Sequence, residues 1–315
     1  MGAEQFRAGF VTLIGRPNVG KSTLMNQLIG QKIAITSARP QTTRGRILTV
    51  YTDEDCQIVF LDTPGLHHSR NKLGEYMVRT ARGTLSEVDA VLWLVEAGTV
   101  IGSEERAIGE LLDKSGKPIL LILNKIDTVD ATAVTRTAER FLQEFPFIRS
   151  VTQVSALKRQ RIDEVLQEIR ELLPYGPPFY DEETVTEETE RAIVSEIIRE
   201  KALRLLSDEV PHGIAVTVER MRLRDRNGET DPFREPEPED LMDIEASVIC
   251  EKDSHKGIVI GKGGRMLKQI GIQARKDIEE LLQCRVNLQL FVKVRRDWRD
   301  DATQLRSLGY SERRS

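Results

Sequence analysis

Residues 15–22, Gly-Arg-Pro-Asn-Val-Gly-Lys-Ser, match the phosphate-binding pattern G-x-x-x-x-G-K-[ST]. Backbone N–H groups of such a loop point at phosphate oxygens, and its glycines allow a backbone that other residues would strain. Lys21 is expected to reach the β- and γ-phosphates, and the Ser22 hydroxyl to ligate Mg²⁺. The pattern predicts a nucleotide site that includes Gly15, Arg16, Pro17, Asn18, Val19, Gly20, Lys21, Ser22 and Thr23.

A second motif, Asn-Lys-Ile-Asp at 124–127, indicates which base is bound. The Asp127 carboxylate can accept hydrogen bonds from guanine N1 and N2, which are donors that adenine lacks. Ser155 and Ala156, after a later apolar segment, can offer backbone N–H groups to guanine O6. The predicted base site comprises Asn124 as a brace, Lys125 along the base plane, Ile126, Asp127, Ser155, Ala156 and Leu157.

The motif that bears on hydrolysis is Asp-Thr-Pro-Gly at 62–65. Asp62 is expected to hold Mg²⁺ through water, and the Gly65 N–H to sense the γ-phosphate. Thr42 or Thr43 can supply the hydroxyl that closes over the metal, and we slightly favour Thr43. The expected catalytic set is Lys21, Thr43, Asp62 and Gly65, the metal set is Ser22, Thr42, Thr43 and Asp62, and further nucleotide contacts come from Thr63, Pro64 and Leu66.

The order of these motifs resembles the translation-factor-related GTPases. Leu66 stands where Ras-like enzymes carry a glutamine that orients water, so slow intrinsic hydrolysis is expected. Asn18 resembles the asparagine that helps to hold an activating K⁺ in related bacterial GTPases, and it is equally explained as a loop-bracing amide. His67 and His68 could act as general bases, but adjacent histidines in a polar loop are more often solvated.

The elements that must position these residues are apolar strands alternating with helices. Continuous apolar strands separated by helices predict a parallel sheet covered on both faces. The expected strands are 10–14, 47–51, 57–61, 90–95, 119–123 and 151–154, and the expected helices are 21–29, 72–87, 104–115, 131–144 and 161–173.

Three prolines and a glycine at 174–178 predict a domain boundary. We expect a first domain at 1–173, a linker at 174–182 and a second domain at 183–315. The second domain begins with a helix near 187–207 and continues with an α+β pattern around three strands, near 213–224, 243–251 and 285–294. A loop at 231–240, rich in proline and glutamate, is expected to be solvated.

The second domain contains a G-x-x-G step at 261–264, which we expect between an apolar strand and a helix at 265–283. In that setting the step is typical of a KH module, with its core near 213–294, which clamps about four single-stranded nucleotides. Basic residues predominate after 246 and acidic ones at 180–245, although a solvated mixed surface explains the charge equally well. Arg275 and Lys276 are expected on a solvated face, and RNA contacts from Gly261, Lys262, Gly263, Gly264, Arg265 and Lys268.

The two halves together closely resemble the Era family of bacterial ribosome-associated GTPases. The resemblance runs from GRPNVGKST, PQTTR, DTPG, NKID and SAL to VIGKGG, IGIQARKDIE and VKV. It implies an α/β P-loop GTPase domain, mostly parallel and with helices on both faces, followed by an α+β type II KH domain. It also implies GTP hydrolysis, binding near the 3′ end of 16S ribosomal RNA, a role in maturation of the 30S subunit and peripheral contact with the inner membrane. Mg²⁺ is the expected cofactor, and we expect a monomer.

Composition argues against membrane-spanning, exported, disulfide-linked and zinc-binding proteins. With 30% charged residues and a mean hydropathy of −0.35, the chain lacks the apolar run of about 20 residues that spans a bilayer. Its first residues lack export and import patterns, so a cytoplasmic location is expected. Three cysteines without a Cys-x-x-Cys pair make a disulfide framework or a zinc site untenable.

Two other functions compete with a nucleotide-controlled RNA-binding GTPase. In the first, the chain is a constitutive RNA-binding assembly factor that keeps GTP as a structural ligand, and Leu66 favours it. The second, a tRNA-modification GTPase, requires a catalytic cysteine or a cofactor site, whereas Cys56, Cys250 and Cys284 are expected in apolar, uncharged surroundings.

Overall fold

The computed structural model describes residues 6–31, 33–35, 44, 47–62, 64, 71–206, 210–224 and 236–310. They form two compact units that divide between Glu187 and Glu188. Several residues named above lie outside the described residues, namely Thr42, Thr43, Thr63, Gly65, Leu66, His67 and His68.

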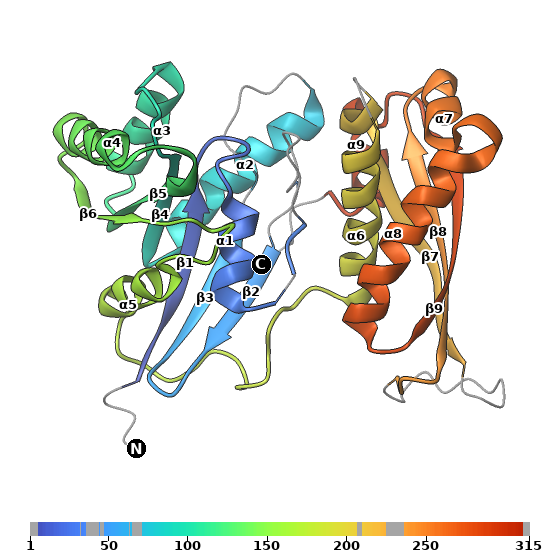
Figure 1. Ribbon diagram of the computed structural model, residues 1–315, viewed down its shortest axis with the longest axis horizontal. Helices are drawn as coiled ribbons and strands as arrows, with labels where there is room; N and C mark the ends of the chain where they lie inside the picture. Colours follow the sequence, from blue (N-terminus) through green and yellow to red (C-terminus); the bar gives the residue numbers. More distant parts are fainter. Residues whose placement is uncertain are drawn as a thin grey trace. The chain divides into compact units, whose positions relative to one another are not determined.

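The first unit is built on a six-stranded sheet with the order β2-β3-β1-β4-β5-β6 (Figure 1). Neighbouring strands run parallel except for β2 and β3. Every residue of β3 and β5 is buried, as expected for strands with both faces covered. The strands are β1 (Arg7–Ile14), β2 (Ile47–Thr52), β3 (Cys56–Asp62), β4 (Ala90–Glu96), β5 (Ile119–Asn124) and β6 (Ile148–Gln153).

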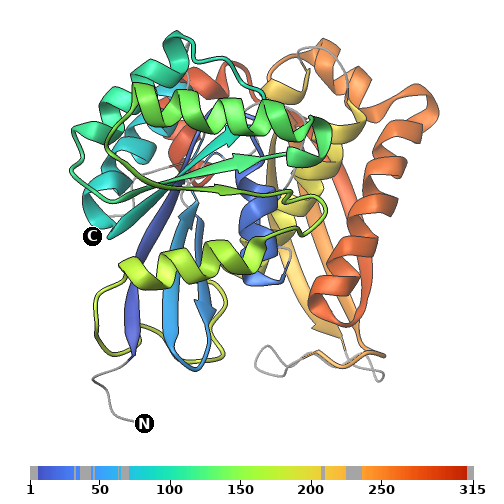
Figure 2. The ribbon, with the colours of Figure 1, turned by 60° about the vertical axis from the view of Figure 1, so that its left-hand side comes forward.

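Helices cover both faces of this sheet, which confirms the predicted layering. Buried side chains of α1 (Lys21–Ile29) and α5 (Ile162–Leu172) pack against one face. The other face packs against α2 (Lys72–Glu87), α3 (Ser103–Asp113) and α4 (Ala131–Glu144). Figure 2 shows α4 and α5, in green and yellow-green, on opposite sides of the strands. The loops that carry the nucleotide motifs therefore meet at the carboxyl ends of the parallel strands.

The segment 174–187 runs along the first unit. The Gln57 side-chain oxygen accepts hydrogen bonds from the N–H groups of Phe179, at 2.7 Å, and Tyr180, at 3.0 Å. The Val185 carbonyl accepts from the Val50 N–H at 2.8 Å, and Thr186 forms a bridge with β2. The residues expected to form a linker, 174–182, are thus held on the sheet, and the chain remains attached to it as far as residue 186.

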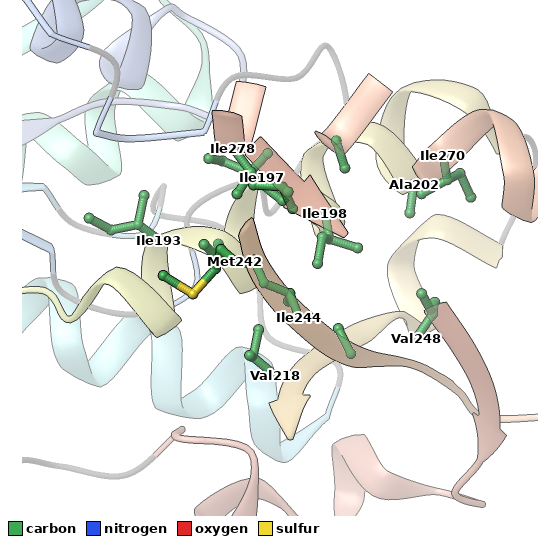
Figure 3. Packing of buried hydrophobic residues seen from close by; sticks show 14 of the residues in the cluster. Ile193, Ile197, Ile198, Ala202, Val218, Met242, Ile244, Val248, Ile270 and Ile278 are labelled. Atoms are coloured by element: carbon green, nitrogen blue, oxygen red, sulfur yellow. The ribbon is translucent and has the colours of Figure 1, made fainter. Parts of the chain in front are cut away.

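The second unit is an α+β domain around the sheet β7-β8-β9, as predicted. Strand β8 is antiparallel to β7 and parallel to β9, so the chain crosses over through two helices between β8 and β9. Side chains from α6, α8 and one sheet face form its core, including Ile197, Ile244 and Ile278 (Figure 3). Its elements are α6 (Glu190–Leu205), β7 (Ala215–Arg224), β8 (Leu241–Cys250), α7 (Asp253–Ile260), α8 (Arg265–Leu282), β9 (Arg285–Val294) and α9 (Ala302–Ser307), with short 3₁₀ turns at Ile126–Thr128, Val210–Gly213, Lys262–Gly264 and Trp298–Asp300.

One predicted element in this unit is wrong. The apolar residues before Gly261 were expected to form a strand, and they form the end of helix α7. Of these apolar residues Val259 is fully buried, whereas Ile258 is 45% exposed, so the run marks one helical turn rather than a strand buried on both sides. The helix ends where Gly261 adopts a positive φ of 71° and its N–H donates to the Gly257 carbonyl.

The acidic loop at 231–240 is described only from residue 236 onward. There the Asp240 carboxylate accepts a hydrogen bond from the Glu237 N–H at 2.8 Å, and Asp240 is buried. Its carbonyl also accepts from the Arg285 N–H at 3.1 Å. The end of the loop is therefore an ordered turn leading into β8, while residues 231–235 lie outside the described part.

Replacing Ile244, fully buried on β8, by alanine is expected to destabilise the second unit by about 2–5 kcal/mol, because the cavity left behind cannot collapse completely. The chain has two tryptophans, Trp93 in the first unit and Trp298 in the second. In a Trp93→Phe background, urea unfolding followed by Trp298 fluorescence reports the second unit alone. The exposed Ile258→Ala is the matched control and should stay within about 0.5 kcal/mol; equal effects of the two would contradict this core.

Candidate functional sites

Two glycines in the loop between β1 and α1 stand where a side chain has no room. A Cβ on Gly15 would lie 2.4 Å from the Leu94 carbonyl oxygen, and one on Gly20 would lie 2.2 Å from Asn124 Nδ2. Gly20 also adopts a φ of 102°, which side chains rarely tolerate. We call residues 15–22 the phosphate cradle; its backbone shape depends on these two positions.

Lys21 lies in the middle of the cradle. Its Nζ donates to the carbonyl oxygens of Gly15, at 3.0 Å, and Arg16, at 2.9 Å. The side chain is buried, and burial lowers its pKa to about 8 although the Asp62 carboxylate acts in the opposite direction. The loop thus presents a desolvated cation at the N-terminus of α1, where phosphate is favoured.

Ser22 and Asp62 form a site that suits Mg²⁺. The Ser22 hydroxyl lies 3.5 Å from Asp62 Oδ2, and Asp62, the last residue of β3, is fully buried. A hydroxyl and a carboxylate are the hard oxygen ligands that Mg²⁺ prefers, and the ion usually keeps phosphate oxygens and waters in its other positions. The described residues therefore fit the metal, whereas Thr42 and Thr43 lie outside them.

Asn124 is the first residue of the loop 124–127, which we call the base loop, and its side chain joins this loop to the phosphate cradle and to the turn at Ala156. Its Nδ2 donates to the Val19 carbonyl at 2.8 Å, and its Oδ1 accepts from the Ala156 N–H at 3.0 Å. The residue is buried at the end of β5. Ser155 N–H donates to the Gln160 carbonyl at 3.3 Å, so the two amides expected to face guanine O6 both have protein acceptors. An Ala156 contact to O6 would share its N–H with Asn124 or replace that bond.

The expected acceptor for the base, Asp127, is held in place by its neighbours. The Ser155 hydroxyl donates to Asp127 Oδ1 at 2.6 Å, and Lys158 lies 3.9 Å from Oδ2. The hydrogen bond from Ser155 keeps the pKa of Asp127 below its usual value, so the carboxylate is an acceptor at neutral pH. Lys125 takes a positive φ of 64°, and its Nζ pairs with Glu96 at 2.8 Å. The role of the Ser155 hydroxyl was missed, because the sequence does not place residue 155 beside 127.

The G-x-x-G step forms a tight loop that ends at the N-terminus of α8. Gly261, Gly263 and Gly264 all have positive φ values, and a Cβ on Gly261 would lie 2.7 Å from Met266 Cβ. No side chain caps the helix. Its N-terminus and the backbone of the loop can therefore approach an anion. The expected cations Lys262, Arg265 and Lys268 are exposed, and the described residues give none of them an ion pair.

A groove of about 340 Å³ adjoins this loop, between α8 and β9. Its lining is apolar with a basic rim, which suits flat bases whose phosphates stay at the edge. Arg275, expected on a solvated face, belongs to this rim. The positions on α8 follow a helical stripe, a signal that could have placed Arg275 here; the lining residues are Gly264, Leu267, Lys268, Gly271, Ile272, Arg275, Leu288 and Leu290.

The cysteines do not form a catalytic or metal site. Cys56, Cys250 and Cys284 are all buried and free, and burial raises the pKa of each, to about 11 for Cys56. A buried neutral thiol is a poor nucleophile. Among the described residues, no group of three or more His, Cys, Asp or Glu could hold a metal ion.

Family models match both units. Residues 10–125 match the family described as 50S ribosome-binding GTPase, and residues 209–299 match the KH domain family. GTPase Era from Alkaliphilus metalliredigens is 50% identical over 305 residues, covering 97% of this chain and 99% of that protein. GTPase Era from Clostridium tetani is 47% identical over 307 residues, covering 98% and 100%.

Two solved structures resemble the whole chain. The crystal structure of Era in complex with MgGDPNP and nucleotides 1506–1542 of 16S ribosomal RNA has a TM-score of 0.91 and 34% identity, covering 98% of this chain and all of that one. A point variant of Era from Aquifex aeolicus, bound to GDP and AlF₄⁻, has a TM-score of 0.90 with the same identity and coverage.

The Asp127→Asn variant is expected to prefer xanthine over guanine nucleotides. An amide can donate to the xanthine O2, while it loses one of the contacts to guanine N1 and N2. The measurement is the Kd for GDP and for XDP. Asp130→Asn is the matched control: Asp130 caps α4 by accepting from the Ala133 N–H, a role that asparagine also fills. Retained guanine preference in Asp127→Asn would contradict the base assignment.

The Lys21→Ala variant is expected to lose nucleotide binding and GTP turnover. It removes the cation at the centre of the cradle, whereas the sheet core does not include Lys21. Calorimetric GDP titration and phosphate release measure the loss, and circular dichroism checks the fold. The exposed Lys114→Ala, on the same unit, should behave as the parent. Full turnover in Lys21→Ala would exclude the cradle as the phosphate site.

Proposed function

Because the chain belongs to the Era family of GTPases, with a P-loop GTPase domain followed by a KH domain, we propose that it binds 16S ribosomal RNA near the 3′ end and acts in maturation of the 30S subunit. It hydrolyses GTP. The observation that carries the RNA part is the exposed basic loop 261–264 beside the α8–β9 groove. It occurs in a chain 34% identical to an Era crystallised with that RNA.

In the nucleotide site, the cradle amides and Lys21 hold the phosphates, and Asp127 accepts from the guanine edge. Ser22 and Asp62 would hold Mg²⁺, with Thr42 or Thr43 completing the site, and the ion supplies positive charge to the β- and γ-phosphates. The Gly65 N–H senses the γ-phosphate. With Leu66 next to it rather than glutamine, intrinsic turnover is slow and depends on another group for acceleration.

For Asn18 two roles remain, as a ligand for an activating K⁺ and as a brace within the cradle. Its positive φ of 66° fits either role, because asparagine tolerates this conformation better than most residues. GTP turnover in K⁺ and in Na⁺ buffers, for the parent and Asn18→Ala, separates the two. A K⁺ ligand makes turnover depend on the ion only in the parent.

In the RNA site, the loop 261–264 and the N-terminus of α8 receive phosphates, and Lys262, Arg265 and Lys268 neutralise them. The apolar lining of the groove, including Leu288 and Leu290, accepts the bases. Arg275 at the rim adds a further cation. Single-stranded RNA fits this geometry because its unstacked bases can enter a groove that a duplex cannot.

The proposal places the protein in the cytoplasm as a monomer that meets the ribosomal subunit there. Peripheral contact with the inner membrane, which the family resemblance implies, belongs to the same proposal. In the described part of the chain no helix is both long and apolar enough to cross a bilayer.

Charge reversal in Lys262→Glu/Arg265→Glu is expected to weaken RNA binding at least a hundredfold and to leave basal GTP turnover unchanged. Each lost phosphate contact should also reduce the slope of log K against log salt by about 1. The measurement is the Kd for an RNA with nucleotides 1506–1542 of 16S ribosomal RNA at several salt concentrations.

Lys276→Glu is the control for that experiment, since Lys276 is exposed on α8 but does not line the groove. It should change affinity far less than the double variant. Unchanged affinity in Lys262→Glu/Arg265→Glu would remove loop 261–264 from the RNA site. The same titration with GDP and with a non-hydrolysable GTP analogue tests the alternative of GTP as a structural ligand, which predicts equal RNA affinity in both states.

A further inference from the structure

Arg16 makes contacts on two sides of the phosphate cradle. Its carbonyl oxygen points inward and accepts the hydrogen bond from Lys21 Nζ at 2.9 Å. Its guanidinium points away from the loop to the first turn of α3, where Nε lies 2.8 Å from Glu104 and Nη1 lies 2.7 Å from Glu105. Arg16 therefore belongs to the cradle through its backbone and is held against α3 through its side chain.

The two carboxylates that bind Arg16 differ in their environment. The Glu104 side chain is 51% exposed, and an exposed ion pair contributes little. The Glu105 side chain is 4% exposed, and its other oxygen accepts from the Gly102 N–H at 3.1 Å. Burial acts to raise the pKa of Glu105, but the hydrogen bonds from Arg16 and Gly102 outweigh it and hold that pKa below its usual value. Glu105 is thus an ionised, buried partner for Arg16, with both carboxylate oxygens hydrogen-bonded.

Apolar packing does not fill the space behind Arg16. A cavity of about 60 Å³ lies there, and its lining includes Arg16, Pro17, Val19, Glu105 and Ile108. A side chain beside a cavity has lost part of its van der Waals contact. The Arg16 side chain therefore has fewer packing contacts on this side, and its polar contacts with Glu104 and Glu105 hold it against α3.

The segment that carries Glu105 also reaches the base loop. It begins at the end of β4, where Glu96 pairs with Lys125 at 2.8 Å and the Ala97 N–H donates to the Asn124 carbonyl at 2.8 Å. Residues 96–105 thus contact the base loop at one end and the phosphate cradle at the other. This segment is a common support for both halves of the nucleotide site.

We propose that Glu105 is a positioning residue of the nucleotide site: it holds Arg16 so that the cradle has its binding shape before nucleotide arrives. The inference rests on the nucleotide site proposed above. A preformed cradle improves affinity because less ordering is left to occur on binding. The cradle wraps phosphates that GDP and GTP share, so loss of the Glu105 contact weakens both ligands alike and leaves turnover at saturation unchanged.

The test is Glu105→Gln, which keeps the side-chain length and an oxygen that can accept from the Gly102 N–H, but removes the charge. We expect the Kd for GDP and for a non-hydrolysable GTP analogue to rise by the same factor, about tenfold. The kcat at saturating GTP should stay within about twofold of the parent. Glu110→Gln, the same substitution at an exposed position of α3, is the control and should change neither constant.

A double-mutant cycle separates positioning from simple destabilisation of α3. In an Arg16→Gln background, Glu105→Gln should raise the Kd by less than about twofold, because its partner is already absent. If Glu105→Gln does not fold, Arg16→Lys gives the same test from the other side, since an ammonium cannot replace the two-nitrogen contact of Arg16. It should raise both Kd values by one common factor.

Two results would overturn the inference: a lower melting temperature with unchanged Kd values, or effects of Arg16→Gln and Glu105→Gln that multiply in the double variant. The Lys21→Ala variant distinguishes a wrong role for Glu105 from a wrong assignment of the nucleotide site. If Lys21→Ala abolishes binding while Glu105→Gln binds as the parent, only the role of Glu105 is wrong. If Lys21→Ala also binds normally, the nucleotide site is misassigned.

Discussion

The side-chain amide of Asn124 is the interaction on which the nucleotide site depends. Its nitrogen holds the cradle at Val19, its oxygen holds the turn at Ala156, and its backbone carbonyl accepts from Ala97. Three loops from distant parts of the chain are thus joined through one buried residue. The parallel sheet makes this possible, because adjacent strands deliver their loops to the same edge. This arrangement requires glycine at position 20, since any side chain there would collide with the Asn124 amide.

Both units have the same kind of anion site, but the two sites differ in whether their cations are buried or exposed. Each places a glycine in positive φ directly ahead of an uncapped helix, Gly20 before α1 in the first unit and Gly264 before α8 in the second. In the first unit the cation, Lys21, is buried and already bound by carbonyl oxygens. In the second, Lys262 and Arg265 stand in solvent. A closed site of the first kind selects one small ligand, whereas an open one binds a long, flexible backbone whose affinity varies with salt.

Local patterns made most of the fold predictable. The layered sheet follows from apolar strands alternating with helices, and both glycine loops follow from spacing along a few residues. Contacts between distant segments were not predictable in this way: Asn124 meets Val19 across 105 positions, and the Ser155 hydroxyl meets Asp127 across 28. The helix α7 was misassigned because Ile258, Val259 and Ile260 have the composition of a strand, and only burial distinguishes a one-sided helix. Thr42, Thr43 and Gly65 stay predictions.

The attachment of the segment 174–187 to the sheet has a consequence for solubility. Strand β2 is an edge strand, and such an edge exposes unpaired backbone groups on which another chain can add a strand. Here the Val185 carbonyl accepts from Val50, and the Thr186 hydroxyl donates to the Leu48 carbonyl at 2.6 Å, so part of that edge is covered from within the same chain. A connection between two domains thereby also protects the sheet against intermolecular β-pairing, and shortening it would expose an aggregation-prone edge.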